Sequence, residues 1–91
     1  MPPLTPTQIH TRPPAALVAA VRERHGLTQL QCAYIVGVTR RAWIGYETKD
    51  QAIPLGLWWL FLLRTQEINE SHLLPIPPRQ RAGAMVHLRP A

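Results

Sequence analysis

Apolar residues recur in several short blocks between positions 15 and 63, and glycine, proline or threonine separates one block from the next. This spacing is typical of a chain of short amphipathic helices rather than of strands, whose apolar residues alternate. Leu17, Val18 and Val21 form one apolar stripe and predict a helix over Ala15–Arg24. Gly26 follows at the position where a helix commonly ends.

The second block predicts a helix over Thr28–Val36, with Thr28 as the N-cap residue. Its apolar residues recur at helical spacing, at Leu27, Leu30, Ala33 and Tyr34. Gly37 comes next, where a left-handed residue can end the helix without steric penalty. A cysteine within this helix, Cys32, is expected to be a buried, inert thiol.

Thr39 is expected to cap a further helix over Arg40–Thr48, whose inward face would include Trp43 and Tyr46. A turn of so few residues makes the two helices cross steeply. The first turn of the second helix, with Arg40 and Arg41, should therefore project from the protein. Glu47 on the same helix is expected to pair with Arg22 or Arg24.

The last block predicts a helix over Leu55–Asn69, starting near Pro54. Apolar residues cover nearly every face of two of its turns, so the helix should be buried all round. A domain of this size cannot enclose it completely, and part of its surface is expected to meet a second subunit. Trp58 and Phe61 are predicted to be core residues, and the predicted dimer contacts are Trp59 and Leu63.

Proline-rich segments flank these helices. Residues 1–13 are predicted to form an extended or loosely docked N-terminal arm, because proline interrupts regular helix. Residues 14–70 would form the helical domain. Residues 71–91 are rich in proline and arginine, and two alternatives stay open for them. One is an extended, dimer-stabilising tail with a short strand over Ala84–Leu88, and the other is a disordered basic tail.

The ordered set of motifs resembles the helix-turn-helix of the Cro/CI (XRE-like) repressor family. The matching residues are Leu27-Thr28-Gln29, Ala33, Gly37-Val38-Thr39, Tyr46-Glu47 and Ile53-Pro54, followed by the run from Trp58 to Leu63. The resemblance covers roughly residues 15–64. It implies an all-α fold, a compact four- to five-helix bundle of the lambda-repressor type. It further implies a plasmid- or phage-borne repressor that binds an inverted-repeat operator as a dimer.

Two positions depart from the family pattern. Lys49 stands where the family usually has glycine, so Lys49 and Asp50 would have to make the turn. Gly45 lies inside the predicted recognition helix, where it costs about 0.5–1 kcal/mol relative to alanine. A close approach of the backbone to DNA would account for it.

The charge of the chain agrees with a polyanionic partner. Ten Lys and Arg residues against five Asp and Glu give a net charge of +5, and all the cations except Lys49 are arginines. Arginine is suited to bidentate contacts with phosphate and guanine. The predicted partner is therefore double-stranded DNA, with bases read by Arg40, Arg41, Ile44 and Gly45. Phosphates would be contacted by Thr28, Gln29, Thr39 and Lys49.

Other functional classes find little support. No nucleophile–base pair, paired carboxylates or phosphate-cradling loop is evident, so no enzyme activity is expected. The histidines, at positions 10, 25, 72 and 87, lack ligand spacing, and neither a metal, a cofactor nor a small-molecule ligand is expected. A single cysteine, no signal-peptide pattern and an apolar run too short to span a membrane favour a cytoplasmic protein. The alternative function is an antitoxin or adaptor that binds a protein through the apolar last helix.

Overall fold

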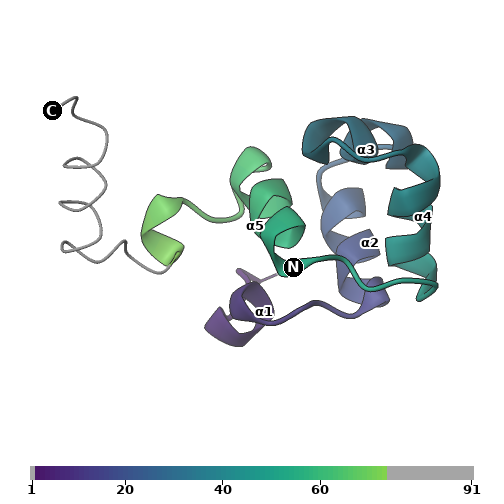
Figure 1. Ribbon diagram of the computed structural model, residues 1–91. Coiled ribbons are helices and arrows are strands. Elements are labelled where there is room, and N and C mark those ends of the chain that lie inside the picture. Colours follow the sequence, from purple (N-terminus) through teal and green to yellow (C-terminus); the bar gives the residue numbers. More distant parts are fainter. Residues whose placement is uncertain (1, 74–91) are drawn as a thin grey trace, which may run out of the picture.

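The chain folds into a bundle of short helices. The computed structural model describes residues 2–73, and within them the chain forms five α-helices, one 3₁₀ helix and no strand (Figure 1). The elements are α1 (Pro6–His10), α2 (Ala15–Arg24), α3 (Gln29–Val36), α4 (Arg40–Thr48), α5 (Leu55–Arg64) and η1 (Glu70–His72). The predicted all-α fold is thereby confirmed. The predictions for the tail beyond residue 73 lie outside the described residues.

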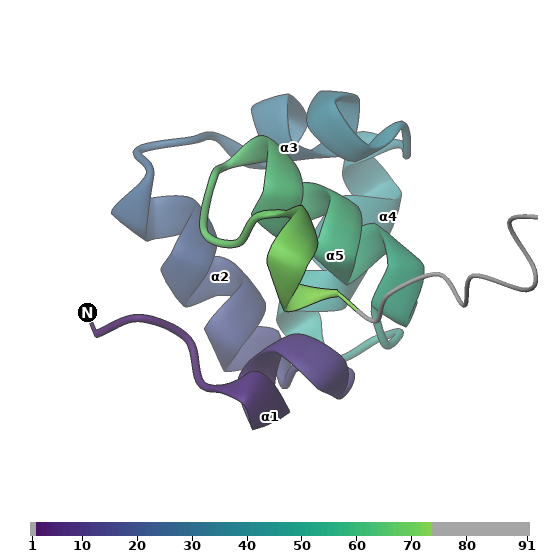
Figure 2. The same ribbon diagram turned by 90° about the vertical axis from the view of Figure 1, so that its left-hand side faces the viewer.

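Helix α5 lies on one side of α2, α3 and α4 (Figure 1). Seen from that side, α5 stands in front, with α3 above it and α1 below it (Figure 2). α3 packs against both α4 and α5, α2 packs against α4, and α1 packs against α5. The α3–α4 pair forms one side of the molecule, away from α1 and η1 (Figure 1). The exposed face of α4 therefore lies away from both ends of the described chain (Figure 1).

The core is built around large aromatic side chains from α4 and α5. Trp43, Trp58 and Phe61 are fully buried. The ring centroid of Phe61 lies 4.9 Å from that of Trp43 and 6.1 Å from that of Trp58. Burial of such side chains is the largest source of stabilisation in a small domain. The predicted core roles of Trp58 and Phe61 are confirmed.

The N-terminal segment is not the extended arm expected from its prolines. Thr5 caps α1 and forms a capping box with Gln8, so that each side chain binds the other residue's main-chain N–H. Ile9 is buried in the core. The indole Nε1 of Trp58 donates a hydrogen bond of 2.9 Å to the main-chain oxygen of Gln8. α1 is thus docked firmly on α5, and the expectation of a loose arm is wrong for this segment.

This docking also changes the interpretation of Trp59. Its Nε1 donates a hydrogen bond of 2.8 Å to the main-chain oxygen of Ile9, and its ring meets His10 edge-on at 5.9 Å. Trp59 is half-buried against α1. Its indole thus makes a contact within the chain, and the expected contact of Trp59 with a second subunit stays a prediction. Leu63 is half-buried against the core, and its contact with a second subunit stays a prediction.

Helix α5 is shorter than predicted. It ends at Arg64 rather than at Asn69, because Gln66 adopts a left-handed conformation with φ of 63°. The chain then turns back, and Glu67 forms an ion pair with Arg24 and a hydrogen bond with Nε2 of His25 at the end of α2. Ile68 is buried in the core. The residues after α5 thus close the bundle by a turn instead of extending the helix.

Helix α3 forms as predicted, but only Leu27 and Ala33 of its predicted apolar pattern face the core. Leu30 and Tyr34 are 60% and 80% exposed. The residues that face the core are Cys32, Ala33 and Val36. Burial raises the pKa of the Cys32 thiol to about 11, so it is protonated and unreactive at neutral pH, as expected.

Candidate nucleic-acid interface

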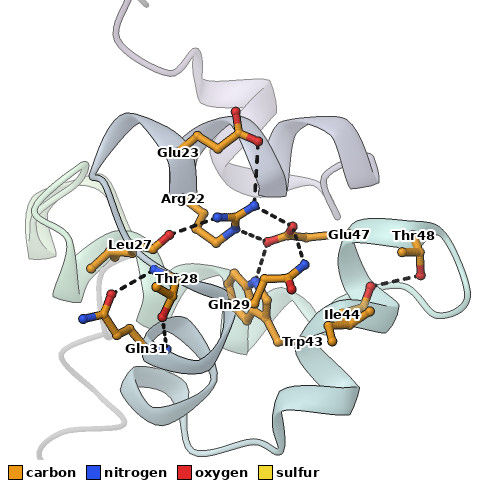
Figure 3. A network of polar contacts seen from close by, with 10 residues as sticks. All are labelled: Arg22, Glu23, Leu27, Thr28, Gln29, Gln31, Trp43, Ile44, Glu47 and Thr48. Carbon is orange, nitrogen blue, oxygen red and sulfur yellow. Dashed lines mark hydrogen bonds and ion pairs between the residues drawn. The ribbon is translucent and has the colours of Figure 1, made fainter.

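The turn between α3 and α4 is fixed by capping residues that can be recognised in the sequence. The side chain of Thr28 accepts a hydrogen bond from the main-chain N–H of Gln31, whose own side chain accepts one from the N–H of Thr28 (Figure 3). This capping box fixes the start of α3. Gly37 ends the helix in a left-handed conformation, with φ of 77°. The Thr39 hydroxyl then accepts from the N–H of Ala42 and caps α4.

The carboxylate of Glu47, whose side chain is 6% exposed, holds α4 against the two preceding helices (Figure 3). Glu47 accepts hydrogen bonds from Arg22 Nε at 2.6 Å and from a terminal guanidinium nitrogen of Arg22 at 3.1 Å. It also accepts from Trp43 Nε1 at 2.5 Å and from Gln29 Nε2 at 3.2 Å. A second terminal nitrogen of Arg22 donates to the main-chain oxygen of Leu27. One carboxylate thus ties together α2, α3 and α4, and its predicted pairing with Arg22 is confirmed.

The electrostatics of this network favour the charged forms. Burial on its own would raise the pKa of Glu47. The hydrogen bonds from Arg22, Trp43 and Gln29 together outweigh burial, and the pKa of Glu47 is lowered from its usual value. The hydrogen bond with Glu47 in turn raises the pKa of Arg22. The pair is therefore ionised throughout the neutral range.

Acidification should weaken the fold through Glu47. Because its folded-state pKa lies below the unfolded value of about 4.3, ionised Glu47 stabilises the protein above that pH. The contribution should disappear as the pH falls through the lower, folded-state pKa. We expect the stability difference between the native protein and a Glu47→Gln variant, measured by urea unfolding, to shrink as the pH falls from about 6 to about 3. A difference that did not vary with pH would show that ionisation of Glu47 does not matter.

Arg40 and Arg41 occupy the first turn of α4, and both are exposed. No acidic residue lies in that turn, and neither arginine has a hydrogen bond or ion pair within residues 2–73. Cations at a helix N-terminus oppose the helix dipole. Ile44, one turn further on, is half-buried. The outer face of α4 therefore presents two long unpaired cations beside an apolar side chain.

Gly45 does not belong to this exposed surface. It is buried, and the side chain of Gln51 lies over it. A Cβ at position 45 would stand 2.9 Å from Nε2 and 3.1 Å from Cγ of Gln51. The glycine thus makes room for a side chain of the same protein, which corrects the expectation that Gly45 itself approaches DNA. Sequence reasoning does not single out Gln51, because only the fold brings it back to α4.

The candidate phosphate-binding residues lie at the start of α3, at the start of α4 and directly after α4. Thr28 and Thr39 are exposed N-cap residues, whereas the amide of Gln29 is turned toward Glu47. Lys49 is exposed and left-handed, with φ of 71°, and makes the turn at which the family usually has glycine. Within residues 2–73, the side chains of Thr28, Thr39 and Gln29 each make a hydrogen bond inside the protein, whereas that of Lys49 makes none.

Two further features were looked for in the described part of the chain, a metal site and a membrane-spanning helix. Among residues 2–73, no group of three or more His, Cys, Asp or Glu side chains is arranged to hold a metal ion. No helix in the same range is both long enough and apolar enough to span a membrane.

Helices α3 and α4, each capped by a threonine and joined at a left-handed glycine, have the geometry of a helix-turn-helix motif. Comparison with known sequences points the same way. The chain is 29% identical, over 83 residues, to a Thermococcus gammatolerans protein that bears the provisional name of an HTH-type transcriptional regulatory protein. The match covers 91% of this chain, which spans only a quarter of the relative's own length. No family model matches the chain, and no solved structure matches it.

Proposed function

We propose that this protein is a sequence-specific, double-stranded DNA-binding transcriptional regulator that represses by occluding a promoter. The observation that carries the proposal is the exposed, unpaired pair Arg40 and Arg41 on the first turn of α4. Their positive charge has no counterpart within residues 2–73, and a phosphodiester backbone or a guanine edge would supply one. The name of the relative, a transcriptional regulatory protein, agrees with this function.

In this proposal α4 enters the major groove as the recognition helix. Arg40 and Arg41 contact guanine edges, and Ile44 touches a thymine methyl group. The starts of α3 and α4 then approach the backbone, where Thr28, Thr39 and the free main-chain N–H of Gln29 can bind phosphate. Lys49 provides a further phosphate contact. The Cro/CI type and a plasmid or phage origin are part of this proposal.

Repression by a dimer is also part of the proposal. Two copies would bind an inverted repeat with half-sites about one helical turn, roughly 34 Å, apart. Because α1 covers part of Trp59, a dimer contact through α5 would be made beside α1, through the exposed part of Trp59 and through Leu63. Sedimentation of the protein with a two-site and a one-site DNA duplex would separate dimeric from monomeric binding.

Selection of bound fragments from a random DNA pool is the direct test of function. A repressor should enrich one sequence, and binding to it should weaken steeply as salt rises, because neutralising phosphates releases counterions. Recovery of no preferred sequence, with binding that is absent or insensitive to salt, would refute the proposal.

The second candidate function is an antitoxin or adaptor that binds another protein. The sequence pattern alone assigns this role to α5. The observation in the structure that favours it is the exposure of Leu30 and Tyr34 on α3, at 60% and 80%. Exposed large apolar side chains that adjoin one another are found at protein interfaces. Loss of partner binding in a Tyr34→Ala variant, with DNA binding unchanged, would support this function.

A further inference from the structure

The residue Gln51, which follows the recognition helix, folds back onto it. The main-chain N–H of Gln51 donates a hydrogen bond of 3.3 Å to the oxygen of Gly45, and its side-chain Nε2 donates one of 3.3 Å to the oxygen of Ala42. Gln51 is thus attached to α4 at two points, a turn apart. Its side chain lies where a side chain at position 45 would stand.

This placement puts an amide on the outer surface of α4. Gly45 is four residues after Arg41, and residues four apart lie on the same face of a helix. The amide that covers Gly45 is consequently the next polar group along the face that Arg41 begins. Gln51 as a whole is exposed, although Gly45 beneath it is buried. A glycine inside the recognition helix, unfavourable by helix propensity, is what allows this cover.

The amide still has free hydrogen-bonding capacity. A glutamine side chain carries two N–H donors and a carbonyl acceptor. Within residues 2–73, its hydrogen bond to the oxygen of Ala42 is the one that its side chain makes, which leaves one N–H and Oε1 unused. An N–H and a carbonyl oxygen side by side match the N7 acceptor and N6 donor of adenine in the major groove.

We propose that Gln51 is a specificity-determining residue, which presents its amide to an adenine edge next to the base pair contacted by Arg41. The proposal rests on the DNA-binding function proposed above. Gly45 and Gln51 act as one unit, in which the glycine provides the space and the glutamine provides the reading group. The hydrogen bonds to Ala42 and Gly45 hold the amide in place before DNA arrives, so less freedom is lost on binding.

The test compares DNA-site selection by the native protein and by a Gln51→Met variant. Methionine keeps the length of the side chain over Gly45 and removes both groups that could read a base. At one position of the selected site, the preference for adenine should fall by about 5- to 100-fold, while preferences elsewhere are retained. A Gln66→Met variant, which makes the same change in the exposed turn after α5, is the matched control and should leave every preference unchanged.

The possible outcomes separate this inference from the proposed function. A native protein that selects no sequence would overturn both. A native protein that selects a site which Gln51→Met still selects with the same preferences would overturn the role of Gln51 alone. The role of Gln51 is likewise overturned if Gln51→Met weakens binding equally on all sequences, since that is the behaviour of a phosphate contact or of a disturbed helix. Thermal unfolding of each variant, followed by circular dichroism, shows whether α4 is intact.

Discussion

Replacing Glu47 with alanine should lower the free energy of unfolding by about 3–5 kcal/mol. The carboxylate receives hydrogen bonds from Arg22, Gln29 and Trp43, and its side chain is 6% exposed. Its removal leaves the guanidinium of Arg22, which is 17% exposed, without its main partner. An unpaired charge at so buried a site is strongly unfavourable. For a domain whose total stability is about 5–15 kcal/mol, such a loss is a large part of the free energy of unfolding.

Urea unfolding followed by tryptophan fluorescence can measure this loss, and the chain offers a matched control. Glu23 also lies near Arg22, at 3.7 Å, but its side chain is 69% exposed. Glu23→Ala should therefore change stability by no more than about 1 kcal/mol. A double variant, Arg22→Met with Glu47→Leu, should recover much of the loss, because it leaves no unpaired buried charge. Equal effects of Glu47→Ala and Glu23→Ala would contradict the proposed role of the network.

Replacing Arg40 or Arg41 with alanine should weaken binding to the preferred DNA site by about 1–3 kcal/mol for each arginine that reads a base. The fold should be almost unaffected, because both side chains are exposed and unpaired within residues 2–73. Binding to the selected site and to unrelated DNA, measured by fluorescence anisotropy, distinguishes the two kinds of contact. Loss on the selected site alone indicates a base contact, and equal loss on both indicates a phosphate contact.

The salt dependence gives a second, independent readout for the same variants. An arginine that neutralises a phosphate should reduce the slope of log affinity against log salt by about one when it is removed. Arg64→Ala is the control, since Arg64 is exposed in the last turn of α5 and carries the same charge. If Arg64→Ala weakens binding as much as Arg40→Ala and Arg41→Ala do, the attraction depends on total charge rather than on α4.

The helix-turn-helix can be predicted from sequence because its boundaries are set locally. Thr28 caps α3, Gly37 ends α3, and Thr39 caps α4. Each of these hydrogen bonds joins groups only a few residues apart in the sequence. The pairing of Glu47 with Arg22 is also predictable, since a lone carboxylate on the inward face of a helix needs a cation. The helix caps depend little on how the whole chain packs, whereas the pair of Glu47 with Arg22, 25 residues apart, requires α2 to pack against α4.

The features that sequence reasoning misplaces depend on packing between distant segments. Thr5 and Gln8 carry the capping-box pattern of α1, but five residues rarely form a stable helix alone, and Trp58 and Trp59 must hold it. The end of α5 depends on a left-handed Gln66, for which no local signal is present in the sequence. Sequence reasoning expects Gly45 on the surface proposed to face DNA. In the fold, the side chain of Gln51 covers it.

The left-handed turn at Lys49 bears on any attempt to make this protein more rigid. A residue with a Cβ adopts that conformation at an expense of about 1–2 kcal/mol, which glycine would avoid. Substitution by glycine would thus improve thermal resistance and at the same time delete the lysine charge at the end of α4. At position 49, thermal stability therefore favours glycine, whereas the proposed contact with DNA favours lysine.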